Sequence, residues 1–237
     1  MKAIILAAGR GSRMKSMTDD NPKCMVKLHG EPLIEHQLRS LRQAGITEVA
    51  VVTGYLSNML QGYGDHKFHN PRWADTNMVS SLATASEWLN AEPCIVSYSD
   101  ICYDASAVTS LMDSDADLAI TYDPDWERQW TARFGDPLLD AETFKLGAGG
   151  ELTEIGGKPD TISEIEGQYM GLLRFTPPAW TDLESMRHAL SDARRDALDM
   201  TSALQNIIDR RNIRVMPIAY RGAWGEIDSS EDISVFE

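Results

Sequence analysis

The chain begins with a short apolar run followed directly by a glycine-rich loop, and this pairing limits the available folds more than any other feature. Residues 2–7 read Lys-Ala-Ile-Ile-Leu-Ala, and Gly9 ends the run. An apolar run of this length is typical of a strand buried on both faces, as in a parallel sheet covered by helices. The loop after it, Gly9 to Arg13, can present backbone N–H groups to a phosphate.

Strand and helix signals alternate along the next residues, up to Thr121. Short apolar runs predict strands, and apolar residues spaced three or four apart predict helices. This order predicts an α/β fold in which helices cover both faces of a mainly parallel sheet. The predicted strands are 48–53, 94–97 and 118–121, and the predicted helices are 32–44, 56–60, 78–89 and 104–112.

After Asp123 the pattern changes to tryptophans, glycines and short alternating pieces, which predict an antiparallel section. Two helices and a further strand follow, and residues 223–237 close the chain. The alternating pieces are 143–146, 152–155 and 168–175, the helices are 178–190 and 199–210, and the strand is 213–217.

Charge is distributed unevenly along the chain. The whole sequence has 22 Lys and Arg against 36 Asp and Glu, a net charge of −14, which argues against a broad nucleic-acid-binding face. The first thirty residues, in contrast, carry six Lys and Arg and only two carboxylates, Asp19 and Asp20. A small basic pocket in an acidic body suits a small anion, with carboxylates left to hold a divalent metal.

The apolar and cysteine patterns bear on location. Ala3–Ala8 is the longest apolar run, far shorter than the roughly 18–20 residues of a membrane span. Cys24, Cys94 and Cys102 are too few and too irregularly spaced for a disulfide framework or a zinc site. We therefore expect a reduced, cytoplasmic protein without membrane insertion. The residues leave the oligomeric state open, a homodimer included.

The glycine loop matches neither of two common phosphate-binding motifs. A P-loop requires Gly-Lys-Ser/Thr after four spacer residues, which this loop lacks. A dinucleotide fingerprint requires a third glycine where Met14 stands. On the residues alone, both a phosphate-binding loop and a plain tight turn remain open.

The segment Leu6-Ala-Ala-Gly-x-Gly-Ser-Arg13, followed by Asn21-Pro22-Lys23, resembles the signature of nucleotidyltransferases that join a nucleoside triphosphate to a phosphorylated metabolite. The whole chain is similar to bacterial CTP-dependent enzymes that act on phosphocholine, 2-aminoethylphosphonate or phosphoglutamine, with the phosphoglutamine branch sharing most segments. The other segments that carry the likeness are 76–79, 95–100, 130–133, 137–142, 166–171, 200–202 and 224–228.

The resemblance implies a fold, a domain organisation and a reaction. The fold is Rossmann-like, with a mixed, mostly parallel central sheet and helices on both faces. We expect a single nucleotidyltransferase domain over residues 1–237, with an acceptor-binding subregion at about 123–175. In the reaction, an acceptor phosphate or phosphonate oxygen attacks the α-phosphorus of CTP, and pyrophosphate leaves. Relatives of this kind serve the synthesis of cell-surface polysaccharides.

Because both reactants are anions, cations and a metal must offset their repulsion. By resemblance, Arg13 binds the β- and γ-phosphates, where a guanidinium can bind in bidentate fashion. Lys23 bridges the α-phosphate and the acceptor, and Lys158 brings a second ammonium to the acceptor phosphate. Gly157 stands where relatives have a glutamate before that second lysine. A solvated surface lysine is the alternative interpretation at both lysine positions.

The nucleotide site predicted by the resemblance combines the glycine loop with a later helix start. Asn77 and the two serines after it lie where relatives read the base, although Asn77 can equally be an N-cap. The absence of Gln-x-x-Pro-x-Gly favours CTP over the nucleotides of sugar enzymes. The predicted nucleotide-binding residues are Leu6, Ala7, Ala8, Gly9, Gly11, Ser12, Arg13, Lys23, Asn77, Ser80, Ser81 and Ser99.

Three carboxylates are candidate Mg²⁺ ligands. Asp100 follows an apolar run, at the end of a strand where α/β sheets form their ligand crevices. Glu226 and Asp228 point to one face if their segment is extended. Magnesium takes one or two carboxylates together with substrate phosphates. The resemblance makes Asp100 and Asp228 the ligands and Glu226 a third, either direct or through a water. A helix-capping role is the alternative for Asp228.

The acceptor-binding residues follow from the subregion after Asp123. Trp126 and Trp130 can surround an amine with aromatic faces, and Arg133 can clamp a carboxylate. Packing of both tryptophans under a lid is the alternative. The resemblance adds Glu166 and Tyr169 to the acceptor side.

Three rival functions remain. A sugar-1-phosphate nucleotidyltransferase would use another base. A metal-dependent glycosyltransferase of similar fold usually carries Asp-x-Asp where this chain has Tyr98-Ser99-Asp100, and lacks the Lys23 motif. A catalytically silent nucleotide-binding subunit would not need the full set of charged residues.

Overall fold

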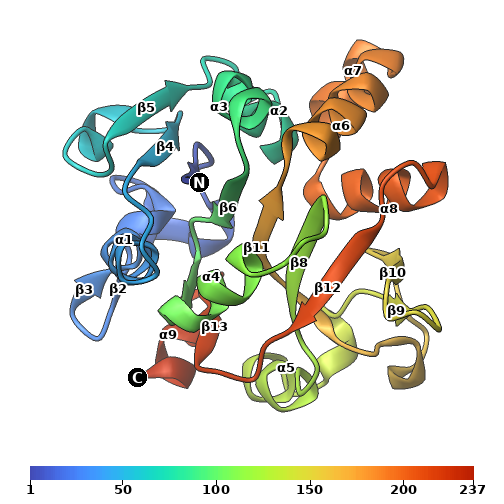
Figure 1. The fold of residues 1–237 in the computed structure, drawn as a ribbon. Helices are drawn as coiled ribbons and strands as arrows, with labels where there is room; N and C mark the ends of the chain where they lie inside the picture. The colour runs from blue at the N-terminus through green and yellow to red at the C-terminus, as the bar shows by residue number, and fades with distance from the viewer.

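The computed structural model describes residues 1–237, except for the side chain of Lys15. A seven-stranded sheet has the order β12-β8-β11-β6-β1-β4-β5 and runs through the whole molecule (Figure 1). Only β11 runs antiparallel to its neighbours, so the sheet is mixed and mostly parallel. The strands are β1 (Lys2–Ala7), β4 (Val49–Thr53), β5 (His66–His69), β6 (Cys94–Tyr98), β8 (Leu118–Asp123), β11 (Gln168–Phe175) and β12 (Val215–Ala219).

Short strands pair outside this sheet, and helices cover both of its faces (Figure 1). The short strands are β2 (Lys27–Leu28) with β3 (Glu31–Pro32), β7 (Ile101–Tyr103) with β13 (Trp224–Glu226), and β9 (Phe144–Leu146) with β10 (Leu152–Ile155). The helices are α1 (Leu33–Gln43), α2 (Met78–Leu82), α3 (Ser86–Ala91), α4 (Ala105–Met112), α5 (Glu127–Phe134), α6 (Pro177–Ala189), α7 (Asp192–Ala197), α8 (Met200–Arg210) and α9 (Ser230–Phe236).

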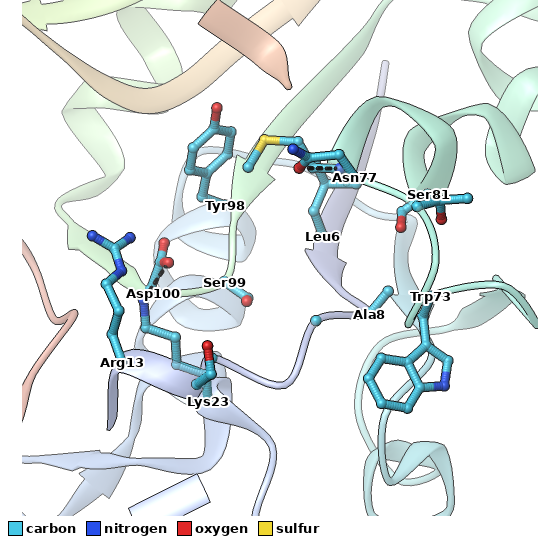
Figure 2. A pocket seen from close by; sticks show the side chains of 15 residues that line it. Leu6, Ala8, Arg13, Lys23, Trp73, Asn77, Ser81, Tyr98, Ser99 and Asp100 are labelled. Atoms are coloured by element: carbon cyan, nitrogen blue, oxygen red, sulfur yellow. Dashed lines mark hydrogen bonds and ion pairs between the residues drawn. The ribbon is translucent and has the colours of Figure 1, made fainter. Parts of the chain in front are cut away.

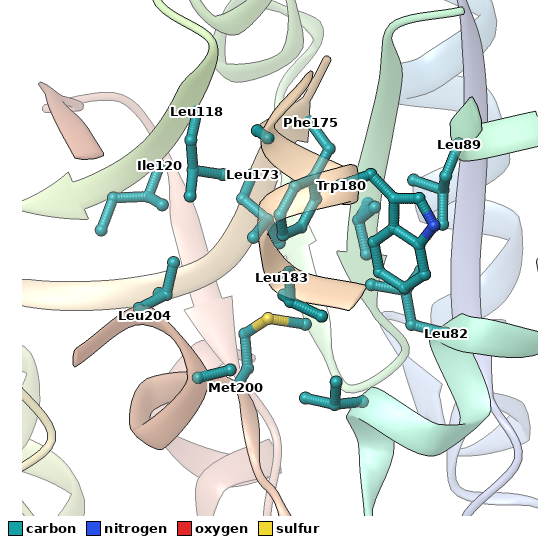
Figure 3. Close-up of a cluster of buried hydrophobic side chains, with 14 of the residues drawn as sticks. Leu82, Leu89, Leu118, Ile120, Leu173, Phe175, Trp180, Leu183, Met200 and Leu204 are labelled. Atoms are coloured by element: carbon teal, nitrogen blue, oxygen red, sulfur yellow. The ribbon is translucent and has the colours of Figure 1, made fainter. Parts of the chain in front are cut away.

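Strand β1 shows why the first apolar run is continuous. Successive side chains of a strand point to opposite faces. Ile4 and Leu6 pack into the core formed with α2, α3, α6 and α8, whereas Ala3 and Ile5 pack into the core formed with α1 and α4. Both faces of β1 are therefore covered, as predicted. The core on the first face includes the fully buried Trp180 (Figure 3).

Several boundaries differ from those predicted. The helix predicted at 78–89 is divided into α2 and α3 by a turn at Ala83–Ala85. There the Thr84 and Ser86 hydroxyls donate to the backbone carbonyls of Ser81 and Ala83, and such local bonds compete with a continuous helix. The strand predicted at 213–217 lies two residues later, after Arg211 ends α8 in a left-handed conformation.

Two predictions for the region after Asp123 had different outcomes. Strands β9 and β10 pair antiparallel, as predicted. Strand β11 does not join them but lies between β6 and β8 in the main sheet. The sequence signals missed β5, an edge strand with charged and polar side chains, and also missed α7. Among the described residues, no helix combines the length and apolar character that crossing a lipid bilayer requires.

Candidate active site

Two adjoining cavities open near the carboxyl ends of β1 and β6, the edge at which α/β sheets bind ligands. The first has a volume of about 280 Å³ and extends from Arg13 to Trp73. The second has a volume of about 390 Å³ and is lined mainly by later parts of the chain. Arg13, Met78 and Tyr98 line both cavities, so the two spaces meet at these residues.

The glycine loop after β1 is shaped to hold Lys23. Gly11 adopts a left-handed conformation with φ of 69°. A Cβ atom at Gly11 would lie 2.8 Å from the side-chain carbons of Lys23, closer than real Cβ atoms approach. The absence of a side chain at Gly11 therefore lets the buried stem of Lys23 lie against the loop, and Lys23 lines the first cavity.

Four charged side chains from distant parts of the sequence meet where the cavities join. The Lys23 Nζ donates to Asp100 Oδ2 at 2.6 Å and also to Asp228 Oδ1. Arg13 Nη2 lies 3.0 Å from the same Asp228 oxygen. The structure thus brings together the residues that the sequence pointed to in four separate segments. Figure 2 shows Arg13, Lys23 and Asp100 at one end of the first cavity.

Pairing between β7 and β13 brings the remaining carboxylates to Asp100. Glu226 is the register partner of Ile101, and the Ile227 N–H donates to the Asp100 carbonyl at 2.9 Å. Carboxylate oxygens of Asp100, Glu226 and Asp228 lie within 4.8 Å of one another. Asp100 Oδ1 is buried and accepts a hydrogen bond from no described group. This all-oxygen donor set fits Mg²⁺.

The clustered charges shift one another's pKa values. Burial alone would lower the pKa of the Lys23 ammonium, but Asp100, Asp228 and Glu226 raise it above its usual value. Burial would raise the pKa of Asp228, but Lys23 together with Arg13 and Arg133 holds it below the usual range. Burial and the charges of Asp228 and Asp100 raise the pKa of Glu226. Lys23 therefore stays charged, and the Glu226 carboxyl is harder to ionise than a free glutamate.

Two predictions about this cluster need correction. Arg133 does not face the acceptor side as a free clamp, because its side chain is 0% exposed and its N–H groups bond to Glu226, Asp228 and Asp232. Asp228 does not cap the last helix, because Ser229 is the N-cap of α9 and forms a capping box with Asp232. The metal-ligand interpretation of Asp228 remains a prediction.

The far end of the first cavity is lined by polar groups and one indole. Asn77 caps α2 through a bond from the Met78 N–H to its side-chain oxygen, and its side chain also lines the cavity. Ser81 lines the cavity as well, and its hydroxyl oxygen accepts from the buried Asn70 amide at 2.9 Å. Trp73 and Ser81 lie at the end away from Arg13 (Figure 2).

The second cavity is acidic and aromatic. Asp140, Glu142 and Asp199 line it, and Arg13 is the single cation among the described lining residues. The Gln168 side-chain amide accepts from the Glu142 N–H and donates to the Glu142 carbonyl, so these two bonds hold the backbone of Glu142 in place. Burial, with Asp199 and Asp140 nearby, raises the pKa of the Glu142 carboxyl to about 7. This space suits a ligand that carries a positive charge.

Most predicted site residues line one of the two cavities, but several do not. Trp126 and Trp130 are both 3% exposed and pack in one cluster with Ala141 and Ile165, but Trp130, like Tyr169, lines the second cavity and Trp126 does not. For Trp126 the packing alternative therefore holds in this structure. The residues that line neither cavity are Ala7, whose side chain lies in the core, Ser80, Trp126, Arg133, Lys158 and Glu166.

Lys158 and Glu166 have other partners. The Lys158 ammonium donates to the Leu138 carbonyl at 2.6 Å, and the Glu166 carboxylate accepts from the Leu146 N–H at 2.6 Å. The Ser80 hydroxyl donates to the Arg195 carbonyl. The roles predicted for these three side chains remain predictions, with no support from the cavity geometry.

Sequence reasoning missed some lining residues. Trp73 forms the end wall of the first cavity. Gly54, the glycine directly after β4, could have indicated that another part of the chain packs closely against this point. A Cβ atom at Gly54 would lie 2.5 Å from Trp73 Cβ and 2.6 Å from the Ala8 carbonyl oxygen. Asp140 and Glu142 lie in the segment 137–142 that carries the family likeness, but no pattern gave them a role, and Asp199 lies in no such segment, although all three line the second cavity.

The chain matches the family described as MobA-like NTP transferase domain over residues 3–200. It is 37% identical over 251 residues to CTP:phosphoglutamine cytidylyltransferase of Campylobacter jejuni, covering 99% of this chain and 98% of that protein. It is 24% identical over 243 residues to 2-aminoethylphosphonate cytidylyltransferase of Lancefieldella rimae, covering 99% and 91%. A shorter match, 40% over 93 residues, relates it to choline-phosphate cytidylyltransferase of Streptococcus pneumoniae, covering 38% and 41%.

Solved structures share the fold. The inositol-1-phosphate CTP transferase from T. maritima superposes with a TM-score of 0.76 at 20% identity, covering 99% of this chain and 94% of that one. The CTP:phosphocholine cytidylyltransferase from Streptococcus pneumoniae superposes with a TM-score of 0.71 at 22% identity, covering 98% and 96%. The predicted α/β fold class is confirmed by the sheet order and by these superpositions.

Proposed function

Because the chain belongs to the MobA-like NTP transferase family, we propose that it is a Mg²⁺-dependent cytidylyltransferase that transfers CMP from CTP to a small phosphorylated or phosphonate acceptor. One observation carries the proposal: Lys23, Asp100 and Asp228 are in direct contact where the two cavities meet. A reaction between two anions requires cations at the point where the reactants meet. The cluster of carboxylates at the same junction supports a metal site for the triphosphate.

Lys23 and Arg13 bind carboxylates in the protein without substrate, and we propose that they change partners when CTP binds. In the first cavity the triphosphate offers stronger, multiply charged acceptors than a carboxylate does. Asp100 and Asp228, with Glu226, would then hold Mg²⁺, which offsets charge on the phosphates when bound. Lys23 would orient the acceptor oxygen and the α-phosphate, and Arg13 would bind the β- and γ-phosphates.

The end of the first cavity away from Arg13 supports recognition of a base. The Ser81 hydroxyl oxygen already accepts from Asn70, so its proton is available to a ligand. A hydroxyl donor suits the O2 and N3 acceptors on cytosine, and the Trp73 indole offers an apolar surface beside it. Asn77 and Ser99, which also line this cavity, add polar contacts for the nucleotide.

The second cavity supports an acceptor that is an anion at one end and a cation at the other. Its single described cation, Arg13, stands at the junction, and Asp140, Glu142 and Asp199 line the remainder. Two of the relatives are named for choline phosphate and for 2-aminoethylphosphonate, and both acceptors carry an ammonium group. Phosphoglutamine, for which a third relative is named, carries an α-amino group. We propose an ammonium-bearing acceptor, held within the subregion at about 123–175 and the start of α8.

A pyrophosphate-release assay tests the proposal. The protein is mixed with Mg²⁺, each of four nucleoside triphosphates, and a panel of phosphocholine, 2-aminoethylphosphonate, phosphoglutamine and hexose 1-phosphates. We expect pyrophosphate only with CTP and an ammonium-bearing acceptor. Release only with hexose 1-phosphates would instead show a sugar nucleotidyltransferase. Release of a nucleoside diphosphate from a nucleotide sugar would show a glycosyltransferase, and no turnover at all would favour a silent binding subunit.

We propose a cytoplasmic location, because Cys24, Cys94 and Cys102 are free and thiols stay reduced in the cytoplasm. We also propose that the protein supplies activated intermediates for the synthesis of cell-surface polysaccharides.

A further inference from the structure

Arg133, on α5, is the most completely buried cation near the proposed metal site. Its side chain is 0% exposed. Its Nε donates to Asp232 Oδ1 at 2.9 Å, and its Nη1 donates to Glu226 Oε2 at 2.9 Å. Its Nη2 reaches Asp232 Oδ2 at 3.4 Å and Asp228 Oδ2 at 3.5 Å. These carboxylates are 93 to 99 residues further along the chain.

Such burial requires a specific arrangement of partners. Taking a guanidinium out of water costs several kcal/mol unless its N–H groups are all paired in good geometry. Here the planar group bonds to three carboxylates at once, and the rings of Trp130 and Phe134 lie 5.3 and 4.8 Å from its central carbon. The rings exclude water and restrict the side chain to one position. Arg133 is thus held rigidly, and it holds its partners in turn.

The contacts divide the carboxylate oxygens between two sides. Arg133 bonds to Oε2 of Glu226 and to Oδ2 of Asp228. On the opposite side, Lys23 and Arg13 contact Oδ1 of Asp228. Each of these carboxylates therefore has one oxygen bonded to Arg133, and the other oxygen of Asp228 contacts the two cations at the junction of the cavities. An orientation of this kind presents oxygens to a cation from one direction.

Arg133 also acts on the backbone of Asp228, through Asp232. Asp232 Oδ2 accepts from the Asp228 N–H at 2.9 Å and from the Ser229 N–H at 2.8 Å. Arg133 Nε fixes the other oxygen of Asp232. Arg133 therefore restrains Asp228 both at its carboxylate and, through Asp232, at its backbone.

We propose that Arg133 is a positioning residue that holds the Glu226 and Asp228 carboxylates in the orientation in which they bind a divalent cation. It does so without contact to the acceptor. The inference rests on one part of the proposed function, namely that Asp100, Glu226 and Asp228 form the metal site. A lysine at this position would keep the charge but offer three N–H donors from a single nitrogen, so it could not reproduce the four contacts that Arg133 makes from three nitrogens of a planar group.

Mn²⁺ titration followed by electron paramagnetic resonance tests the proposal, with and without CTP and with no acceptor present. The test variants are Arg133→Lys and Asp232→Asn. The matched control is Arg187→Lys, because Arg187 is also buried and ion-paired, to Glu184 on α6, but lines neither cavity. Thermal unfolding of each variant reports on the fold independently of the metal.

We expect Arg133→Lys to weaken Mn²⁺ binding about tenfold or more, because substitution of a residue that hydrogen-bonds to metal ligands typically lowers metal affinity by this amount. Arg187→Lys should leave Mn²⁺ binding unchanged. Asp232→Asn should weaken it less, and the double variant should show less than the product of the two effects, because both act through Asp228. The acceptor KM of Arg133→Lys, measured at saturating Mn²⁺, should match that of the wild-type protein.

Three results would overturn the inference: a wild-type protein that binds no Mn²⁺, an Arg133→Lys dissociation constant within twofold of wild type, or a change confined to the acceptor KM. If Arg133→Lys fails to fold, Asp232→Asn carries the test by the same criteria. A wild-type protein that binds Mn²⁺ through this set but transfers no CMP would overturn the proposed function and leave the positioning role of Arg133 in place.

Discussion

The two cavities that meet at Arg13 are built in different ways. The first is lined by three short stretches, the loop after β1, residues 73–81 and the end of β6, together with Lys23. The second gathers side chains from α5, β11, α8, β13 and the loops between them. A pocket formed from a few loops that follow parallel strands can be recognised from local motifs, whereas in a pocket formed by long-range assembly the sequence does not show which side chains face one another.

The charges of the two cavities differ as well. Lys23 and Arg13 line the first, while Asp140, Glu142 and Asp199 line the second. The first cavity therefore suits a polyanion, and the second suits a cationic group. If this comparison is correct, substitutions in the first cavity should alter turnover and nucleotide binding. Substitutions of the three carboxylates that line only the second cavity away from the junction, Asp140, Glu142 and Asp199, should alter acceptor binding alone.

The largest effect should come from the charged residues at the junction. Lys23→Ala and Asp100→Ala should each lower turnover at least about 100-fold, because charge stabilisation of roughly 3 kcal/mol is lost. The measurement is kcat from initial rates of pyrophosphate release. Lys27→Ala is the control, since Lys27 is an exposed lysine only four residues away. A near-normal kcat in either junction variant would show that the first cavity is not where the reaction takes place.

Glu142→Gln sharpens the contrast between the cavities. Loss of a charged partner for an ammonium corresponds to about 1.5–3 kcal/mol, so the acceptor KM should rise about 10- to 100-fold. The CTP KM should stay within about twofold, since Glu142 lines only the second cavity. Glu154→Gln serves as control, because Glu154 pairs with Lys145 on the β9–β10 hairpin. Equal rises in both KM values would show that the cavities are not separate in function.

The same division explains what the sequence could predict. The strand–loop start, Lys23, Asp100 and Asp228 could be found because each lies in a local motif or directly after an apolar run. At Arg133 the sequence shows a cation near tryptophans and so predicts a role in acceptor binding, but it does not show the partners 93 to 99 residues away. The carboxylates Asp140, Glu142 and Asp199 come from a loop and a helix start that are almost 60 residues apart, so no local pattern shows that they line one cavity.

Acceptor binding should depend on pH through Glu142. Burial and the charges of Asp199 and Asp140 raise its pKa to about 7, so below this pH the carboxyl of the empty cavity is mostly protonated and neutral. The ionised form binds an ammonium, so the acceptor KM should fall as pH rises through 7. Between pH 6 and pH 8 the expected change is about tenfold.

The control for this pH effect is Glu142→Gln, in which the phosphate of the acceptor still titrates but the side chain cannot. Subtracting its profile from that of the wild-type protein isolates the contribution of Glu142. A wild-type profile parallel to that of the variant would mean that the second cavity does not present this carboxylate to the acceptor.

The smallest effect should come from the Trp73 indole at the far end of the first cavity. Trp73 rests on Gly54, and the Tyr55 ring lies 5.2 Å from its own, so the indole is fixed as a wall. Stacking of a base on an aromatic ring contributes about 1–3 kcal/mol, and Trp73→Leu, which keeps an apolar contact, should raise the CTP KM about fivefold. The acceptor KM should not change, since Trp73 lines only the first cavity. CTP should also quench tryptophan fluorescence in the wild-type protein and in a Trp88→Phe control, but not in Trp73→Leu. Quenching that survives in Trp73→Leu would place the base elsewhere, and the first cavity would then hold only the triphosphate.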